Sequence, residues 1–196
     1  MMDKKWEQLE LEINICRRCE LYRNRMNSVI GEGNINADVM IIADYPGVYE
    51  DRIGKPFQGK NGELFNKIMT SCGFSRNEHI YIAYVLKCKP FKNEKPNKQI
   101  LDSCSGFLYK QIDLIKPKII VLMGATALSC LYGNEIKLSN ARGTWLKWDK
   151  TLIMATHHPS ALIKNPKLKN ESWSDCKQII SKYREIVDYS HFAPFF

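Results

Sequence analysis

Hydrophobic positions along the chain alternate between two patterns. Short apolar runs occur at residues 39–42, 80–86 and 152–155, and in the strand expected at 118–123 after its first residue, Lys118, as in strands that are buried on both faces of a parallel sheet. Apolar residues recur at helical spacing over residues 4–14, 64–72, 100–112, 125–132 and 173–187, and Ser172 is a candidate N-cap for the last helix. The alternation predicts an α/β fold, a three-layer α/β/α sandwich with a mostly parallel central sheet.

Polar residues follow three of the predicted strands. Asp44 comes after the first run, residues 84–88 end the second, and His157 and His158 follow the last. Because ligands of parallel α/β sheets bind outside the carboxyl ends of the strands, these residues are expected to line one cleft.

The length and charge narrow the class of protein. A chain of 196 residues suits one domain, which we assign to residues 1–187, followed by an aromatic C-terminal tail at residues 188–196. No apolar run reaches the roughly 18 residues of a membrane span, and the charged N-terminus lacks a signal peptide core. We therefore expect an intracellular protein, cytoplasmic or nucleoid-associated, with no membrane partner. The net charge of +8 favours contact with phosphates without establishing it.

Four of the seven cysteines form a possible ligand set. Two residues separate Cys16 from Cys19, and fifteen separate Cys88 from Cys104. The second interval is too open for a zinc ribbon, but a four-cysteine zinc site and a [4Fe–4S] cluster both remain possible from the spacing. The cysteines can also be incidental, as we expect for Cys72, Cys130 and Cys176, which lie at apolar helix positions.

Ordered motifs over almost the whole chain carry a resemblance to a known family. They include the segments CRRCEL at 16–21, GEGN at 31–34, GKPFQG at 54–59, KCKP at 87–90, RGTW at 142–145, THHPSAL at 156–162 and WSD at 173–175. In this order and spacing the sequence resembles the iron–sulfur uracil-DNA glycosylases, family 4 of the uracil-DNA glycosylase superfamily.

The resemblance implies an enzyme that flips uracil out of single- or double-stranded DNA and hydrolyses its N-glycosidic bond, as in base excision repair. It implies a [4Fe–4S] cofactor, with zinc as the less expected alternative, on Cys16, Cys19, Cys88 and Cys104. The expected catalytic residues are Asp44 and His158, and the expected substrate-binding residues are Tyr45, Phe57 and Tyr84. The expected DNA-binding residues are Ser160, Ala161, Leu162, Lys164 and Arg142, supported by the basic stretch at residues 87–98.

Two of the expected site residues depart from the family pattern. Asp44 stands where Glu is usual, and Tyr84 stands where an Asn reads uracil. A Tyr offers one hydroxyl and more bulk than the donor and acceptor of an amide. The alternative is therefore a weak or inactive DNA-binding scaffold or replication accessory on the same fold. The three phenylalanines of the tail are a possible docking peptide for a protein partner.

Overall fold

The computed structural model describes residues 2–91 and 94–196. Two residues of the basic stretch at 87–98, Lys92 and Asn93, lie outside the described residues. A six-stranded sheet has the order β1-β3-β2-β4-β6-β5. Its strands are β1 (Glu32–Gly33), β2 (Val39–Ala43), β3 (Ile80–Tyr84), β4 (Ile119–Met123), β5 (Trp145–Trp148) and β6 (Thr151–Thr156). The four central strands are parallel, and the two edge strands, β1 and β5, are antiparallel to their neighbours.

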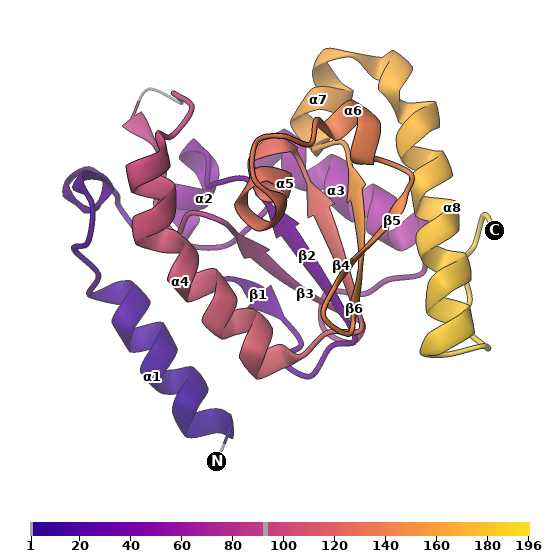
Figure 1. Cartoon of the computed structure of the whole chain (residues 1–196), viewed down its shortest axis with the longest axis horizontal. Coiled ribbons are helices and arrows are strands. Elements are labelled where there is room, and N and C mark those ends of the chain that lie inside the picture. The colour runs from indigo at the N-terminus through magenta and orange to yellow at the C-terminus, as the bar shows by residue number, and fades with distance from the viewer. Residues whose placement is uncertain (1, 92–93) are drawn as a thin grey trace.

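Helices cover both faces of this sheet (Figure 1). They are α1 (Met2–Asn14), α2 (Val48–Ile53), α3 (Gly59–Ser71), α4 (Lys98–Ile115), α5 (Ala125–Tyr132), α6 (Leu138–Ala141), α7 (Pro159–Lys164) and α8 (Lys169–Ile186). Helices α1, α4, α5 and α6 pack on one face, and α3 and α8 pack on the other. The predicted α/β sandwich with a mostly parallel sheet is confirmed.

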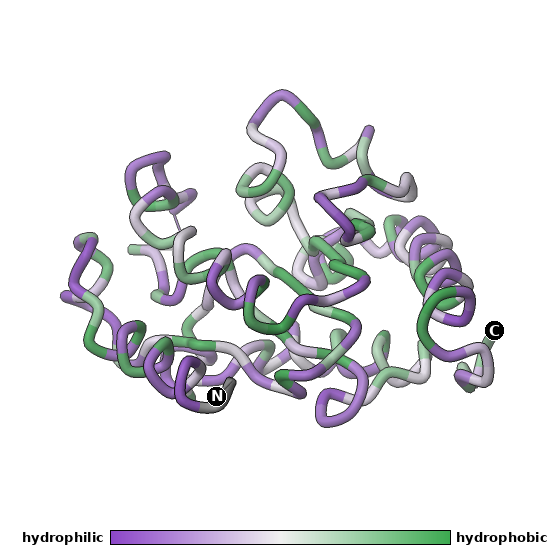
Figure 2. The backbone as a smooth tube through the Cα atoms, turned by 60° about the horizontal axis from the view of Figure 1, so that its bottom comes forward, coloured by the Kyte–Doolittle hydropathy of each residue, from purple (hydrophilic) through white to green (hydrophobic). Residues whose placement is uncertain are grey.

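The strands are apolar throughout because each contributes to two cores. In β2, Val39 and Ile41 face α3 and α8, whereas Met40 and Ile42 face α4 and α5. All five residues of β2, β3 and β4 are buried, which explains their uninterrupted apolar runs. Figure 2 follows the same pattern, with hydrophobic segments inside the fold and hydrophilic ones at the outer turns.

The register of the sheet aligns the carboxyl ends of its central strands. Ala43 of β2 pairs with Tyr84 of β3 and Met123 of β4, and Met123 pairs with Thr156 of β6. The residues that follow these four strands therefore emerge at one edge of the sheet, as the sequence predicted.

Some local predictions were wrong. Ser172 does not cap α8, which begins three residues earlier at Lys169. Two short helices that the apolar pattern did not predict, α2 and α7, follow Pro46 and His158. Both helices have only six residues, too few to produce a clear apolar period.

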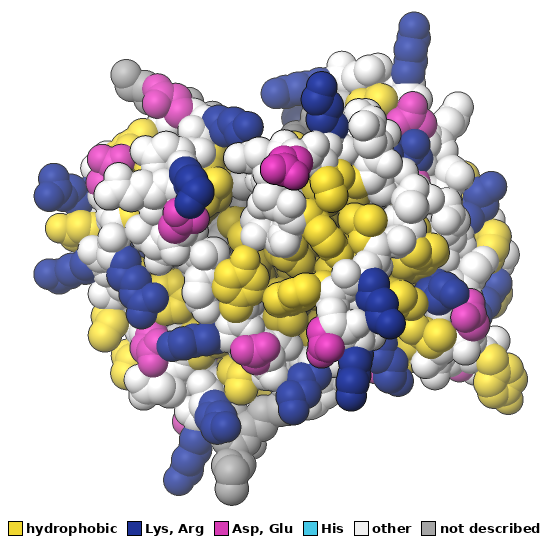
Figure 3. Space-filling view, in the orientation of Figure 1, with side chains coloured by type: hydrophobic (Ala, Val, Ile, Leu, Met, Phe, Trp, Pro, Cys, Tyr) yellow, Lys and Arg dark blue, Asp and Glu magenta, His cyan; other side chains and the backbone are white. Residues whose placement is uncertain are grey.

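The C-terminal tail folds back on its own chain. His191 and Ala193 are buried, and the ring of His191 stacks on Phe74 with centroids 4.8 Å apart. Tyr189, Phe192 and Phe195 stay exposed, so docking of a protein partner here stays a prediction. Among the described residues, no helix is long and apolar enough to cross a membrane. Figure 3 shows apolar side chains in the middle of one face, with Lys and Arg mostly around its rim.

Candidate active site

Asp44 directly follows β2, and its carboxylate lies at the start of α5. Oδ1 accepts a hydrogen bond from the backbone N–H of Ala127 at 2.8 Å. Gly124 permits this approach, because a Cβ there would lie 2.5 Å from both carboxylate oxygens and its φ is +113°. Burial raises the pKa of Asp44 to about 6, opposed by hydrogen bonds from the backbone of Ala127 and Thr126. Asp44 is therefore a partly buried carboxyl group whose pKa lies just below neutral pH.

His158 is the N-cap of α7. Its Nδ1 accepts a hydrogen bond from the backbone N–H of Ser160 at 3.1 Å and lies 2.8 Å from the Ser160 hydroxyl. Burial lowers the pKa of His158 to about 4, so the imidazole is neutral at pH 7. Because Nδ1 acts as an acceptor, the ring proton belongs on Nε2. The side chain is therefore a neutral N–H donor in a fixed orientation.

Three aromatic rings gather beside His158. The ring of Phe57 stacks on Phe65 at 4.0 Å and lies 5.6 Å from the His158 ring, measured between centroids. The hydroxyl of Tyr84 accepts a hydrogen bond from the backbone N–H of Phe57 at 3.0 Å. Phe57 has a φ of +50°, a left-handed conformation that this bond helps to hold. Burial raises the pKa of Tyr84, so its phenol keeps its proton at neutral pH.

Phe57 and Tyr84 are almost completely enclosed. Phe57 is 2% exposed and Tyr84 is 1% exposed. The predicted site residues Asp44, Phe57, Tyr84 and His158 thus come together at the carboxyl edge of the sheet. Tyr45 differs, because its half-buried side chain packs against the core group that includes the cysteines.

The four candidate ligand cysteines also come together, although they belong to distant segments. Cys16, Cys19, Cys88 and Cys104 line one small cavity, together with the basic residues Arg18, Arg25 and Lys87. Within residues 2–91 and 94–196, no three His, Cys, Asp or Glu side chains converge as the ligands of a single metal ion. Two of the sulfurs accept hydrogen bonds, Cys88 from the Arg25 guanidinium at 3.2 Å and Cys104 from the Lys87 backbone N–H at 3.3 Å.

Comparisons with known proteins identify the family of this chain. The uracil DNA glycosylase superfamily matches residues 30–177. The chain belongs to this superfamily.

Several relatives are type-4 enzymes. The type-4 uracil-DNA glycosylase of Thermotoga maritima is 38% identical over 152 residues, which cover 76% of this chain and 79% of the relative. The type-4 uracil-DNA glycosylase of Sulfurisphaera tokodaii is 31% identical over 195 residues, 93% of this chain and 89% of the relative. The type-4 uracil-DNA glycosylase of Archaeoglobus fulgidus is 34% identical over 176 residues, 86% and 88% of the two chains. The expected family 4 resemblance is confirmed.

In this member of the superfamily, the residues of α7 divide between the interior and the surface. The backbone N–H of Ser160 donates a hydrogen bond to His158, and Leu162 is only 2% exposed. Leu162, one of the expected DNA-binding residues, therefore does not face solvent in this structure, whereas its apolar neighbour Ile163 is 43% exposed. Lys164 is exposed and Ala161 is partly buried. Contact of this helix with DNA stays a prediction.

Two basic residues of the expected DNA surface have other partners. The Arg142 guanidinium pairs with the buried carboxylate of Asp175. Lys87 is 1% exposed, so its inclusion among the phosphate-contacting lysines was wrong for this structure. The Lys87 ammonium instead donates to the carbonyl of Tyr84 at 2.7 Å and to the side-chain oxygen of Gln111 at 2.6 Å.

Sequence reasoning missed two residues that shape the site. Glu50 is buried, and its carboxylate accepts hydrogen bonds from the backbone N–H groups of Gly47 and Gln58, both at 2.9 Å. It thereby joins the turn after Asp44 to the turn that carries Phe57. Gln111 is fully buried in α4 and binds Lys87. A Gln inside an apolar helix face was the available signal, because a buried amide needs polar partners.

Proposed function

We propose that this chain hydrolyses the N-glycosidic bond of uracil in DNA and leaves an abasic site. The names of its type-4 relatives support this substrate and reaction. The observation that carries the proposal is the neutral imidazole of His158, whose Nε2–H is available beside the ring of Phe57.

In this reaction the bond between uracil N1 and the sugar C1′ breaks, and its electron pair leaves with the base. Negative charge develops on the uracil carbonyl oxygens, where the His158 Nε2–H stabilises it as a fixed hydrogen-bond donor. The oxygen of a water molecule bonds to the cationic C1′, and Asp44 orients this water and accepts its proton. A carboxylate with a pKa of about 6 is ionised at neutral pH and remains basic enough for this transfer.

Recognition of the flipped base falls to Phe57 and Tyr84. The Phe57 ring provides a stacking surface. The Tyr84 oxygen already accepts from the Phe57 N–H, so its own O–H proton is left for an acceptor such as a uracil carbonyl. An Asn at this position would also offer its amide oxygen as an acceptor for uracil N3–H. The neutral phenol of Tyr84 has no second group that could accept this hydrogen bond. We therefore propose that Tyr84 recognises uracil through a hydrogen bond to one of its carbonyl oxygens alone.

The cysteine cavity fits a [4Fe–4S] cluster held by Cys16, Cys19, Cys88 and Cys104. The four sulfurs surround a shared space, as a group of several atoms requires, whereas a zinc ion needs all four within about 2.3 Å of one point. The position of Lys87 supports the assignment, because this buried residue lines the same cavity and a buried cation needs an anion nearby. When bound, the cluster would cross-link the segments that carry the four cysteines.

The enclosure of Phe57 and Tyr84 favours a second candidate function. Because Tyr84 is 1% exposed, a base can enter only if the rings move. If they do not, the chain is a DNA-binding scaffold or replication accessory without glycosylase activity.

One assay separates the two functions. The anaerobically purified protein is incubated with an oligonucleotide that contains one uracil, and alkali then cleaves any abasic site. We expect strand scission that is lost in Asp44→Ala and His158→Ala and kept in Asp113→Ala, which removes an exposed carboxylate on α4.

Binding of the oligonucleotide without scission by the iron-loaded protein would refute the glycosylase and favour the scaffold. The variant Tyr84→Asn then tests the cause, because opening the pocket and restoring the amide should create scission if Tyr84 alone blocks it.

A further inference from the structure

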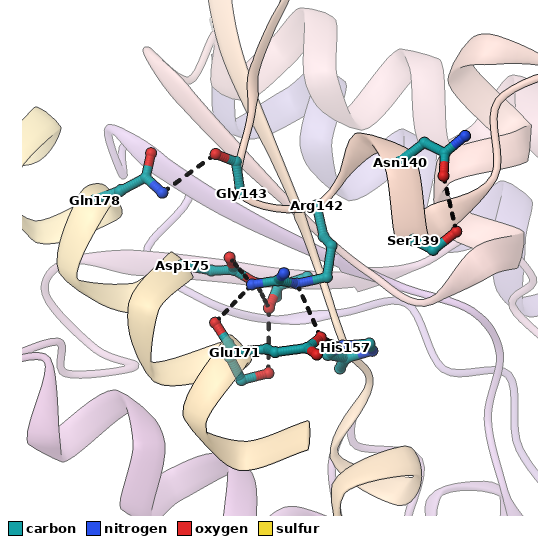
Figure 4. Close-up of polar contacts among 10 residues, drawn as sticks. Ser139, Asn140, Arg142, Gly143, His157, Glu171, Asp175 and Gln178 are labelled. Atoms are coloured by element: carbon teal, nitrogen blue, oxygen red, sulfur yellow. Dashed lines mark hydrogen bonds and ion pairs between the residues drawn. The ribbon is translucent and has the colours of Figure 1, made fainter. Parts of the chain in front are cut away.

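Arg142 connects the segment after α6 to the first turns of α8 (Figure 4). Its Nη2 donates to Asp175 Oδ1 at 2.6 Å and its Nε donates to Oδ2 at 3.2 Å, so the guanidinium grips the carboxylate with two bonds. Nη2 also donates to the backbone carbonyl of Glu171 at 2.8 Å. The Asp175 side chain is 0% exposed, so Arg142 neutralises a buried charge.

The same carboxylate holds the end of β6. The Thr156 hydroxyl donates to Asp175 Oδ2 at 2.7 Å, and the ring of His157 lies 2.9 Å from the Glu171 carboxylate. The backbone of Arg142 also bridges to Ala155 of β6. Three consecutive residues that lead directly into His158 are therefore tied to Arg142 or α8.

The end of β6 also touches the other half of the candidate active site. The backbone carbonyl of Thr156 accepts a hydrogen bond from Gly124 N–H at 3.1 Å. Gly124 is the residue whose missing side chain makes room for the Asp44 carboxylate. A shift of Thr156 therefore displaces His158 along the chain and Gly124 through the sheet.

Gly143 indicates that the hydrogen bonds around Asp175 require close packing. Its φ is +69°, and a Cβ there would lie 3.0 Å from Asp175 Oδ1. Its carbonyl accepts a hydrogen bond from the Gln178 side chain at 3.2 Å, which adds another tie to α8 (Figure 4).

The charges around Arg142 are unfavourable for binding phosphate. One guanidinium, that of Arg142, faces the two carboxylates of Asp175 and Glu171. Its Nε and Nη2 donors are already engaged within the protein. Counterion release by DNA needs free positive charge at the surface, which this arrangement does not offer.

We propose that Arg142 is a positioning residue, which holds His158 and Asp44 in register through Asp175 and Thr156 and does not contact the DNA backbone. The inference rests on the proposed glycosylase function. A misplacement of about 1 Å at a reacting group can cost on the order of a hundredfold in rate. The effect of losing Arg142 should therefore fall on the chemical step and not on DNA affinity.

The test compares Arg142→Lys, Arg142→Ala and Asp175→Asn with the wild-type protein. Single-turnover excision of uracil and binding of the same oligonucleotide are measured at several salt concentrations. We expect excision to slow by roughly ten- to a hundredfold in each variant, with the Kd and its salt dependence unchanged. Combining Arg142→Ala with Asp175→Asn should slow excision little further, because the two residues act as one unit.

Arg142→Lys is the decisive variant, because it keeps the positive charge and loses the two-bond grip. Lys150→Ala is the matched control, since it removes one positive charge from the turn at the opposite end of β6. A full excision rate in Arg142→Lys would overturn the proposal. So would weaker DNA binding in Arg142→Ala with a salt slope reduced by about one, which indicates a phosphate contact.

A readout independent of activity separates this inference from the proposed function. The ring nitrogens of His158 are followed by NMR in wild type and Arg142→Lys. If the wild-type protein excises no uracil, the proposed function fails, but a shift of the His158 signals in Arg142→Lys still supports positioning. Unchanged His158 signals would overturn the inference whether or not the protein is active. Thermal unfolding and iron content identify a variant that fails to fold.

Discussion

The unusual ionisation of Asp44 predicts how both activity and stability depend on pH. Its ordinary pKa is 3.8, and burial raises it to about 6 in the folded protein. At pH 7 roughly nine carboxyls in ten are ionised, and at pH 5 roughly one in ten. If the carboxylate orients water, the single-turnover excision rate should fall about tenfold per pH unit below pH 6 and level off above pH 7. His158 has a pKa of about 4, so this limb belongs to Asp44.

The same shift makes Asp44 a destabilising residue at neutral pH. Its folded pKa lies above its unfolded pKa, so the folded state holds more protons between about pH 4 and 6, and stability falls as pH rises through that window. A shift of about two pH units corresponds to about 3 kcal/mol of unfolding free energy at pH 7, as an upper value. The N–H of Ala127 donates to Oδ1, and an Asn side chain keeps this acceptor.

The variant Asp44→Asn tests both consequences. At pH 7 it should unfold at a temperature higher by up to roughly 6–12 °C, and the gain should disappear below pH 4. Its excision rate should be low and should lack the limb near pH 6. The reasoning is refuted if the variant is no more stable than wild type at pH 7, or if wild-type excision is flat from pH 5 to pH 8.

Three further predictions concern packing and charge. Leu162→Ala should lower the unfolding free energy by about 2–5 kcal/mol because it leaves a cavity at a buried position. Ile163→Ala should change the unfolding free energy by less than about 1 kcal/mol and should weaken binding to duplex DNA. Denaturant unfolding measures the first effect in both variants, and fluorescence titration measures DNA binding. Lys87→Met should make the reduction potential of the reconstituted cluster more negative, because it removes a buried positive charge beside the ligand cysteines; spectroelectrochemistry measures this, and an unchanged potential would contradict it. Gly124→Ala should lower the melting temperature and displace the Asp44 carboxylate, since φ is +113° and the space is occupied; an unchanged melting temperature would show that the turn tolerates a side chain.

The fold was predictable because its strands are buried on both faces. An apolar run such as Val39–Ala43 is specific to that environment, and the polar residue after it marks the carboxyl edge of the sheet. β1 was missed because two residues, Glu32 and Gly33, carry no period. Their pairing with β3 depends on tertiary contact alone.

The sequence named candidate residues for the site, but it did not reveal the residues that they contact. Asp44 and His158 could be named from motifs, yet the amides that bind Asp44 come from α5, more than eighty residues away. Arg142 reads as a surface cation in the sequence, and only the folded chain brings the buried Asp175 to it. Such pairings join residues whose separation in sequence has no regular value, so no local pattern reveals them.

The segment from Tyr84 to Cys88 connects the proposed base-binding residues with the cysteine cavity. At one end, the Tyr84 hydroxyl holds Phe57, and its backbone carbonyl accepts from the Lys87 ammonium. At the other end, Lys87 and Cys88 line the cavity with the remaining cysteines. Hydrolysis of a glycosidic bond transfers no electrons, so a cluster at these cysteines needs no redox part in the proposed reaction. A cluster there would fix Cys88 and place negative charge beside the Lys87 ammonium, which donates a hydrogen bond to the Tyr84 carbonyl. Loss of the cluster should therefore disturb Tyr84 and Phe57, the proposed base-binding residues, before it disturbs the sheet.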